Sequence, residues 1–61
     1  MSQNDQIAKH LKKRGTINPL EALHLYGCFR LAARIYDLRS KGMIITTEEA
    51  SEGFAVYRWK P

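Results

Sequence analysis

Apolar residues recur at helical spacing over residues 5–41 and at strand-like spacing over residues 43–59. The first helical stretch is predicted to run to about Arg14 and to stop at Gly15. Asn4 or Asp5 can cap its beginning. Its narrow apolar face consists of Ile7, Ala8 and Leu11. The pair Thr16–Ile17 follows, and a single bridge to a strand there would carry Ile17 into the core.

A second, short helix is predicted from the capping chemistry after Asn18. Asn18 is a preferred N-cap residue, Pro19 falls at the first helical position and Glu21 falls where a capping box is completed. Gly27 can adopt the left-handed conformation that ends such a helix. The residues at helical spacing that we expect on one apolar face are Leu20, Leu23 and Tyr26.

A third helix is predicted over residues 28–41, ending before Gly42. Its buried stripe consists of Leu31, Ile35 and Leu38, at i, i+4 and i+7. We expect Leu11, Leu23 and Tyr57 to surround this stripe. A short helix, a tight glycine turn and an arginine-bearing helix form the outline of a helix-turn-helix.

The period changes after Gly42. Residues 43–47 are rich in β-branched side chains, residues 49–53 form a polar loop, and residues 54–59 read as a second strand. We place one parity of the second strand inward: Ala55, Tyr57 and Trp59. An isolated hairpin is marginal in water, so this one should lie on the helices. The fold class predicted is α+β, a winged helix-turn-helix with three helices and a C-terminal β-hairpin, as a single domain over residues 4–60.

Charge is distributed unevenly along the chain. The 61 residues carry a net charge of +4. Residues 1–42 hold eight basic and three acidic side chains, whereas residues 43–61 hold two basic and three acidic ones. A one-sided basic surface favours a polyanionic partner, although a solvated surface is the plainer alternative. With one cysteine, no long apolar run and no signal-peptide core, we expect a cytoplasmic protein without a membrane segment.

Several stretches resemble a family of very small helix-turn-helix proteins that are common in phages and prophages. The stretches are Pro19-Leu20-Glu21-Ala22-Leu23, Gly27-Cys28-Phe29-Arg30-Leu31-Ala32-Ala33-Arg34-Ile35, Asp37-Leu38-Arg39 and Gly42. The resemblance covers about residues 5–59 and is most specific over residues 27–42. It implies a winged-helix fold and suggests DNA binding, without a settled biochemical role.

Two arginines are the leading candidates for base recognition. Arg30 and Arg34 lie four residues apart near the beginning of the third helix, the part of a recognition helix that meets base edges. An arginine can donate two parallel hydrogen bonds to guanine. The alternative for Arg34 is a structural ion pair with Glu21 or with Asp37.

Other residues of the basic half complete the predicted DNA-binding set. Phe29 can contact thymine methyl groups, although we favour its packing into the turn, and Ala32 and Ala33 permit a close approach to the groove or to a helix. Phosphate contacts are expected from four side chains, three of which could instead complement the end of the first helix: Lys12, Lys13, Arg14 and Arg39.

The remaining candidates for chemistry are weak. Cys28 is expected at the N-cap of the third helix, and a helix N-terminus lowers a thiol pKa, but we expect the thiol to be buried and inert. His10 and His24 have no metal-ligand partner at helical spacing and are expected to be solvated. Tyr57 and Trp59 could stack on single strands, although the core has more need of them. We therefore expect no catalytic residues, no metal and no cofactor.

The predicted wing departs from the pattern of a DNA-binding wing. It carries Glu48, Glu49 and Glu52, and no basic residue lies between Lys41 and Arg58. Carboxylates repel phosphate, so either the wing points away from DNA or the scaffold holds a protein. The leading hypothesis is a small transcriptional regulator or architectural factor that binds double-stranded DNA through the third helix, where formation of a homodimer would add affinity. The alternative is a small phage protein that binds and modulates a host protein.

Overall fold

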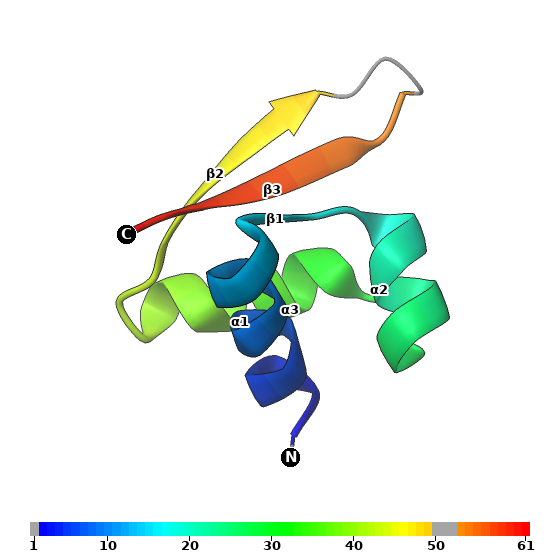
Figure 1. The fold of residues 1–61 in the computed structure, drawn as a ribbon, viewed down its shortest axis with the longest axis horizontal. Helices are drawn as coiled ribbons and strands as arrows, with labels where there is room; N and C mark the ends of the chain where they lie inside the picture. The colour runs from blue at the N-terminus through cyan, green and yellow to red at the C-terminus, as the bar shows by residue number, and fades with distance from the viewer. Residues whose placement is uncertain (1, 50–52) are drawn as a thin grey trace.

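The computed structural model describes residues 2–49 and 53–61. Within these ranges the chain forms three helices and three strands in the predicted α+β order (Figure 1). The elements are α1 (Gln3–Arg14), β1 (Thr16–Ile17), α2 (Pro19–Tyr26), α3 (Leu31–Ser40), β2 (Ile44–Glu49) and β3 (Ala55–Lys60). No helix in the described ranges is long and apolar enough to cross a membrane.

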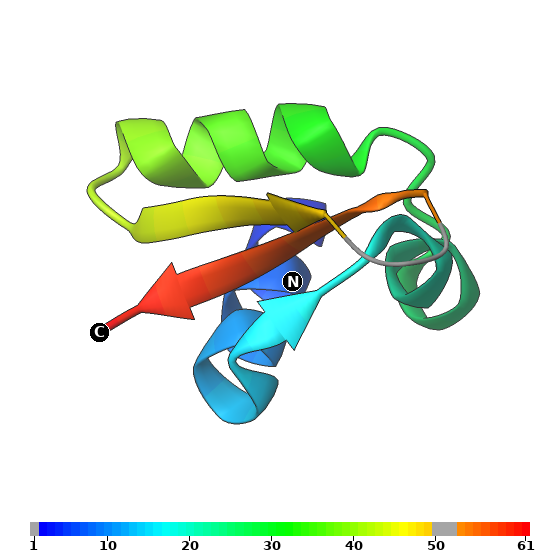
Figure 2. The ribbon, with the colours of Figure 1, turned by 90° about the horizontal axis from the view of Figure 1, so that it is seen from above.

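The three strands of the described residues form one antiparallel sheet in the order β1-β3-β2. Ile17 pairs with Tyr57 across β1 and β3, and Ile45 pairs with Trp59 across β2 and β3. The short strand at Thr16–Ile17 is therefore confirmed. The helices lie on one side of the sheet, and α3 runs alongside β2 (Figures 1 and 2). The hairpin is thereby supported by the helical layer that it needs.

One hydrophobic core lies between the helices and the sheet. Its fully buried side chains are Ile7, Leu11, Ile17, Ala22 and Ile35, and Cys28, Leu31, Leu38 and Ile45 are almost as inaccessible. The predicted stripe of α3 and the position of Leu11 are confirmed. Tyr57 and Trp59 are half-buried and pack against this core, as their inward parity predicts.

The capping box of α2 is confirmed in detail. The Glu21 amide donates to Asn18 Oδ1 over 2.8 Å, and the Asn18 amide donates to Glu21 Oε1 over 3.2 Å. Gly27 ends the helix at φ 63°, and its amide bonds back to the last turn. The predicted cap of α1 is wrong, because Ser2 is the N-cap and Asp5 completes a capping box from the third helical position.

The apolar face predicted for α2 is confirmed at Tyr26, which packs against the core, and is wrong at the two leucines. Leu20 and Leu23 are exposed, and Ala22 is the residue of this helix that is fully buried. The eight-residue helix packs closely on the core through this small side chain, so its leucines flank the contact rather than fill it. Leu23 therefore does not surround the α3 stripe.

The boundaries of α3 and of the hairpin also differ from expectation. Helix α3 begins at Leu31 rather than at residue 28, because Cys28 to Arg30 offer no Ser, Thr, Asn or Asp side chain to cap it. Strand β2 extends through Glu49, which was assigned to the loop, and β3 begins at Ala55. Residues 50–52 of the expected loop lie outside the described residues.

Candidate nucleic-acid interface

The side of α3 that faces away from the core is built from small residues around one large one. Ala32, Tyr36 and Ser40 recur at i, i+4 and i+8, opposite the buried stripe, and all three are exposed. The Tyr36 side chain is 71 % exposed. Ala33 lies beside it and is half-buried. We call this surface, together with Phe29 and Arg30 at its N-terminal end, the α3 face.

The turn before α3 presents two long side chains. Phe29 is 87 % exposed, so the expectation that it packs into the turn is wrong. The buried residue of this turn is Cys28, whose amide donates to the Ala22 carbonyl and whose side chain joins the core. Arg30 is the N-cap of α3 and is exposed, with no side-chain partner among the described residues. Its guanidinium is thus available at the beginning of the helix.

Arg34 is held on the α1 side of α3. Its Nη2 lies 3.4 Å from Asp37 Oδ2, which is one of the two ion pairs left open by the sequence. Asn4 Nδ2 of α1 donates to the same carboxylate oxygen over 3.4 Å. Arg34 is half-buried, and its Nε is buried without a partner in the described residues. Arg34 therefore pairs within α3 with the carboxylate that α1 also contacts through Asn4.

Arg39 joins α3 to the wing. Its Nε and Nη2 donate to the Ile45 carbonyl oxygen over 2.9 and 2.7 Å, and Nη2 also donates to Thr47 Oγ1 over 3.0 Å. These bonds orient β2 against the last turn of the helix. The Nη1 group has no partner among the described residues, which leaves Arg39 some capacity for a further contact.

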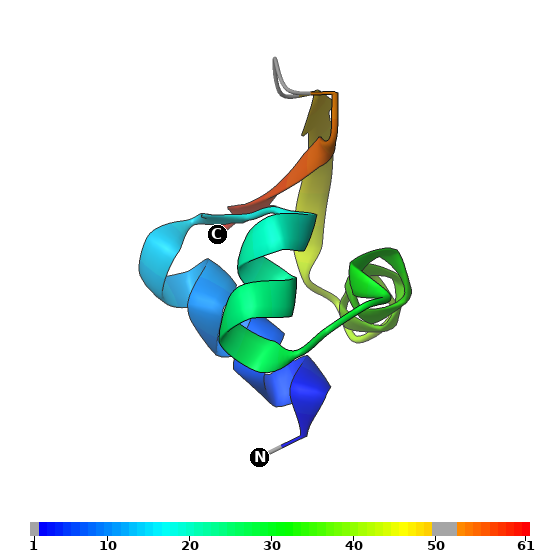
Figure 3. The ribbon, with the colours of Figure 1, turned by 90° about the vertical axis from the view of Figure 1, so that its right-hand side faces the viewer.

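The basic residues at the end of α1 point to two different surfaces. Lys13 and Arg14 line a groove between α1 and α2, together with Lys9. Lys12 instead lines a shallow depression with Lys41, Lys60 and Trp59, next to the end of α3. The end of α1 lies away from the beginning of α3, where Arg30 is the N-cap (Figures 2 and 3). The three consecutive basic residues therefore do not form one patch with Arg30.

The wing carries an exposed ion pair. Arg58 Nε donates to Glu48 Oε2 over 3.1 Å. This hydrogen bond and the positive charge of Arg58 lower the pKa of the Glu48 carboxyl, and the carboxylate raises the pKa of Arg58. Glu49 is exposed at the end of β2, and Glu52 lies outside the described residues. The one arginine of β3 is therefore neutralised by its neighbour.

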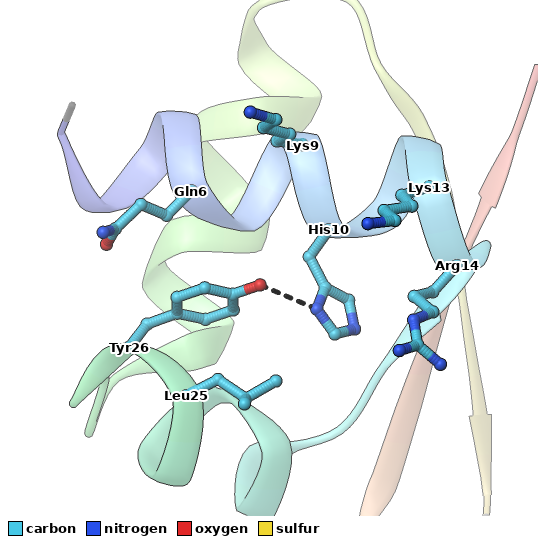
Figure 4. A pocket seen from close by; sticks show the side chains of 7 residues that line it. All are labelled: Gln6, Lys9, His10, Lys13, Arg14, Leu25 and Tyr26. Atoms are coloured by element: carbon cyan, nitrogen blue, oxygen red, sulfur yellow. Dashed lines mark hydrogen bonds between the residues drawn. The ribbon is translucent and has the colours of Figure 1, made fainter.

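The expectation that His10 is solvated is wrong. It is only 7 % exposed, and its Nδ1 lies 2.8 Å from the Tyr26 hydroxyl (Figure 4). The sequence spacing gave no sign of this contact, because it joins α1 to α2. His24 is exposed, as predicted. Within residues 2–49 and 53–61, no cluster of histidine, cysteine and acidic residues is suited to hold a metal ion.

The prediction for Cys28 is confirmed in one part and wrong in another. The thiol is buried, at 2 % exposure, as expected. The residue is not the N-cap of α3, because that position belongs to Arg30. The helix terminus is thus too far along the chain for Cys28 to act as its cap.

Tyr36 is the most prominent residue of the α3 face that sequence reasoning missed. Its signal was present, since residues 29, 32, 36 and 40 lie opposite the stripe of Leu31, Ile35 and Leu38. The helical period places the exposed aromatic there without any tertiary information.

A turn links α2 to α3, and the β-hairpin lies beside α3. This arrangement defines a winged helix-turn-helix class of protein. The chain matches the family described as the winged helix-turn-helix domain over residues 2–58, and it belongs to that family. This fold is associated with DNA binding. No curated protein and no solved structure matches the chain.

Proposed function

We propose that the domain binds duplex DNA by laying the α3 face in the major groove. The observation that carries the proposal is the composition of this face: small residues along the helix, Tyr36 exposed among them, and at the N-terminal end Arg30, whose side chain has no partner within residues 2–49 and 53–61. The major groove of B-DNA is wide enough to admit one helix, and small side chains allow its backbone to come close. The N-terminal part of such a helix meets the base edges.

Arg30, Phe29 and Ala33 keep their predicted roles in this proposal. Arg30 would donate two hydrogen bonds to a guanine, Phe29 would contact thymine methyl groups, and Ala33 would let the helix lie close to the groove floor. Tyr36 is added as a contact one to two turns into the helix. Arg34 contributes mainly by fixing α3 on α1, because its carboxylate partner already satisfies part of its guanidinium.

Phosphate contacts would come from the end of α3 and the depression beside it. Lys41 follows α3 directly, and Lys12 and Lys60 line the same depression. Arg39 would offer only the nitrogen that the wing does not occupy. Lys13 and Arg14 point to the other side of α1, so we assign them to a different surface. The wing contributes little, since its exposed carboxylates oppose phosphate.

A titration of fluorescently labelled duplex DNA tests this function. Binding should be clear at low salt and should weaken steeply between about 50 mM and about 200 mM salt, because cations that neutralise phosphate release counterions. A single module of this size buries about 600–1,000 Å² of surface, so we expect modest affinity for one domain. Absence of duplex binding at the lowest salt would contradict the proposal.

A protein contact is the second candidate, and one observation favours it. Leu20 and Leu25 on α2 are 53 % and 59 % exposed, and they precede the exposed Phe29. Large apolar side chains left exposed to water favour burial against another protein. Sedimentation of the chain alone tests a homodimer through α2. A dimer that becomes a monomer on Leu20→Ser with Leu25→Ser supports this contact, and a monomeric parent chain contradicts it.

Regulation of transcription or an architectural role would follow from DNA binding, and a non-enzymatic domain fits both. A phage or prophage context remains part of the hypothesis. The salt titration separates the two candidate functions, because a domain that contacts only protein has no reason to follow the salt dependence of phosphate neutralisation.

A further inference from the structure

The groove between α1 and α2 is positively charged and partly apolar. It has a volume of about 370 Å³, within the range of small-molecule sites. The cationic side chains that line it are Lys9, Lys13 and Arg14. The other lining residues are Gln6, His10, Leu25 and Tyr26, so no carboxylate of the described residues lines the groove. The cations come from α1 and the apolar wall comes from the end of α2 (Figure 4).

An unpartnered nitrogen belongs to this groove. The His10 ring is 93 % buried, and its edge meets the Tyr26 ring in a T-shaped contact with centroids 5.7 Å apart. Nδ1 is satisfied by the Tyr26 hydroxyl, whereas Nε2 has no hydrogen-bond partner among the described residues. In the tautomer that accepts from Tyr26, Nε2 carries the proton and is a donor without an acceptor. A buried polar atom of this kind calls for a partner.

We propose that this groove binds a phosphate monoester carried on an apolar body. Two ammonium groups and a guanidinium match the double charge of a phosphate monoester better than the single charge of a carboxylate. In the tautomer whose Nδ1 accepts from the Tyr26 hydroxyl, His10 Nε2 supplies one further donor to the groove. Leu25 is exposed beside Tyr26 and provides an apolar surface for the rest of the ligand.

This site is separate from the α3 face. The groove is lined by residues of α1 and α2 and by none of α3, so a duplex against α3 leaves it open. The inference therefore does not depend on the proposed DNA contact. A competing explanation is that Lys13 and Arg14 only complement the C-terminal end of the α1 dipole.

Nuclear magnetic resonance of the ¹⁵N-labelled chain with phenyl phosphate tests the site. We expect saturable shifts in the signals of His10, Leu25 and Tyr26. Phenol and inorganic phosphate, each of which lacks half of the ligand, should bind at least about tenfold more weakly. Absence of saturation, or equal binding of inorganic phosphate, would overturn the proposal in favour of simple charge attraction.

The chain offers a matched pair of variants for this test. Lys13→Gln should weaken phenyl phosphate binding by about tenfold, and Lys12→Gln, the same change at the adjacent position, should leave it unchanged. Equal losses in the two variants would contradict a built site. If Lys13→Gln only lowers the melting temperature, its role is confined to the helix terminus.

A duplex-DNA arm distinguishes the two sources of phosphate. Duplex DNA should leave the groove signals and the affinity for phenyl phosphate unchanged. Displacement of phenyl phosphate by the duplex would assign the groove to the DNA footprint and would overturn the proposal. A chain that binds phenyl phosphate but no DNA would refute the proposed function alone.

Discussion

The α3 face and the α1–α2 groove differ in what each one lacks. The α3 face has the shape of a recognition helix, with small residues around Tyr36, but only Arg30 is a cation without a partner there among the described residues. The groove has three cations and a buried histidine, but it presents no helix to a duplex. The difference teaches that positive charge counted along a sequence does not locate a binding surface. On α3, for example, Arg34 pairs with Asp37, whereas Arg39, five residues later, donates to the Ile45 carbonyl of β2.

Neighbouring residues of α3 provide the largest contrast. Ile35 is fully buried and Tyr36 is exposed. Ile35→Ala should lower the free energy of unfolding by about 2–5 kcal/mol, enough to unfold much of so small a domain. Tyr36→Ala should leave the fold intact and weaken DNA binding. Thermal unfolding followed by circular dichroism checks both variants, and equal losses of stability would show that the two sides of α3 are misassigned.

Arg30 provides the next contrast, now between the two surfaces. Arg30→Ala should cost about 1–3 kcal/mol of DNA binding and reduce the preference at one base pair. Lys13→Ala should have a much smaller effect, because Lys13 lines the groove. Duplex titrations of both variants at one salt concentration measure the difference. Equal losses would mean that the DNA footprint extends around α1 and that the two surfaces act as one.

The cap of α2 tests whether the two surfaces depend on the element between them. Asn18→Ala removes the acceptor of the Glu21 amide and should destabilise the domain by about 1 kcal/mol. At a temperature where the variant is folded, DNA binding and phenyl phosphate binding should both be unchanged. The melting temperature gives the first quantity, and an unaltered value would contradict the capping role.

The wing pair should produce the smallest effect. Arg58→Gln should raise the pKa of Glu48 toward its ordinary value, because the hydrogen bond and the charge of Arg58 are the main causes of its lowering, with a further contribution from Lys60. A lowered folded-state pKa stabilises the fold above the ordinary glutamate pKa, and this contribution disappears as the pH falls through the folded pKa. Because the pair is exposed, the change in stability should be slight. A side-chain carboxyl titration by nuclear magnetic resonance measures the pKa, and an unchanged value would exclude the pair in solution.

Features with a local cause could be predicted from the sequence. Asn18 with Glu21 forms a capping box within four residues, and Leu31, Ile35 and Leu38 follow the period of a single helix. Ile17 lies in the core through the bridge to a strand that the sequence allowed at Thr16–Ile17. The family resemblance added the arrangement of these elements, which the domain match supports.

Features with a tertiary cause could not be predicted. The His10–Tyr26 contact joins two helices, and Arg39 reaches the carbonyl of a strand that follows it. Both depend on angles between elements that no spacing in the chain encodes. The α2 leucines misled for a related reason: Ala22, the small residue, packs on the core because a short helix can approach it closely. Tyr36 differs from these cases, since its exposure follows from the period of α3 alone.

Mapping the amide signals of the ¹⁵N-labelled chain during a titration with duplex DNA tests the central claim most directly. The α3 face predicts that the largest shifts fall on residues 29–36, with smaller shifts at Lys41 and Lys12. The groove residues Lys9, His10 and Leu25 should not move. A DNA-bound chain whose largest shifts lie in the α1–α2 groove or on the exposed face of α2, with the α3 signals unmoved, would contradict recognition by this helix.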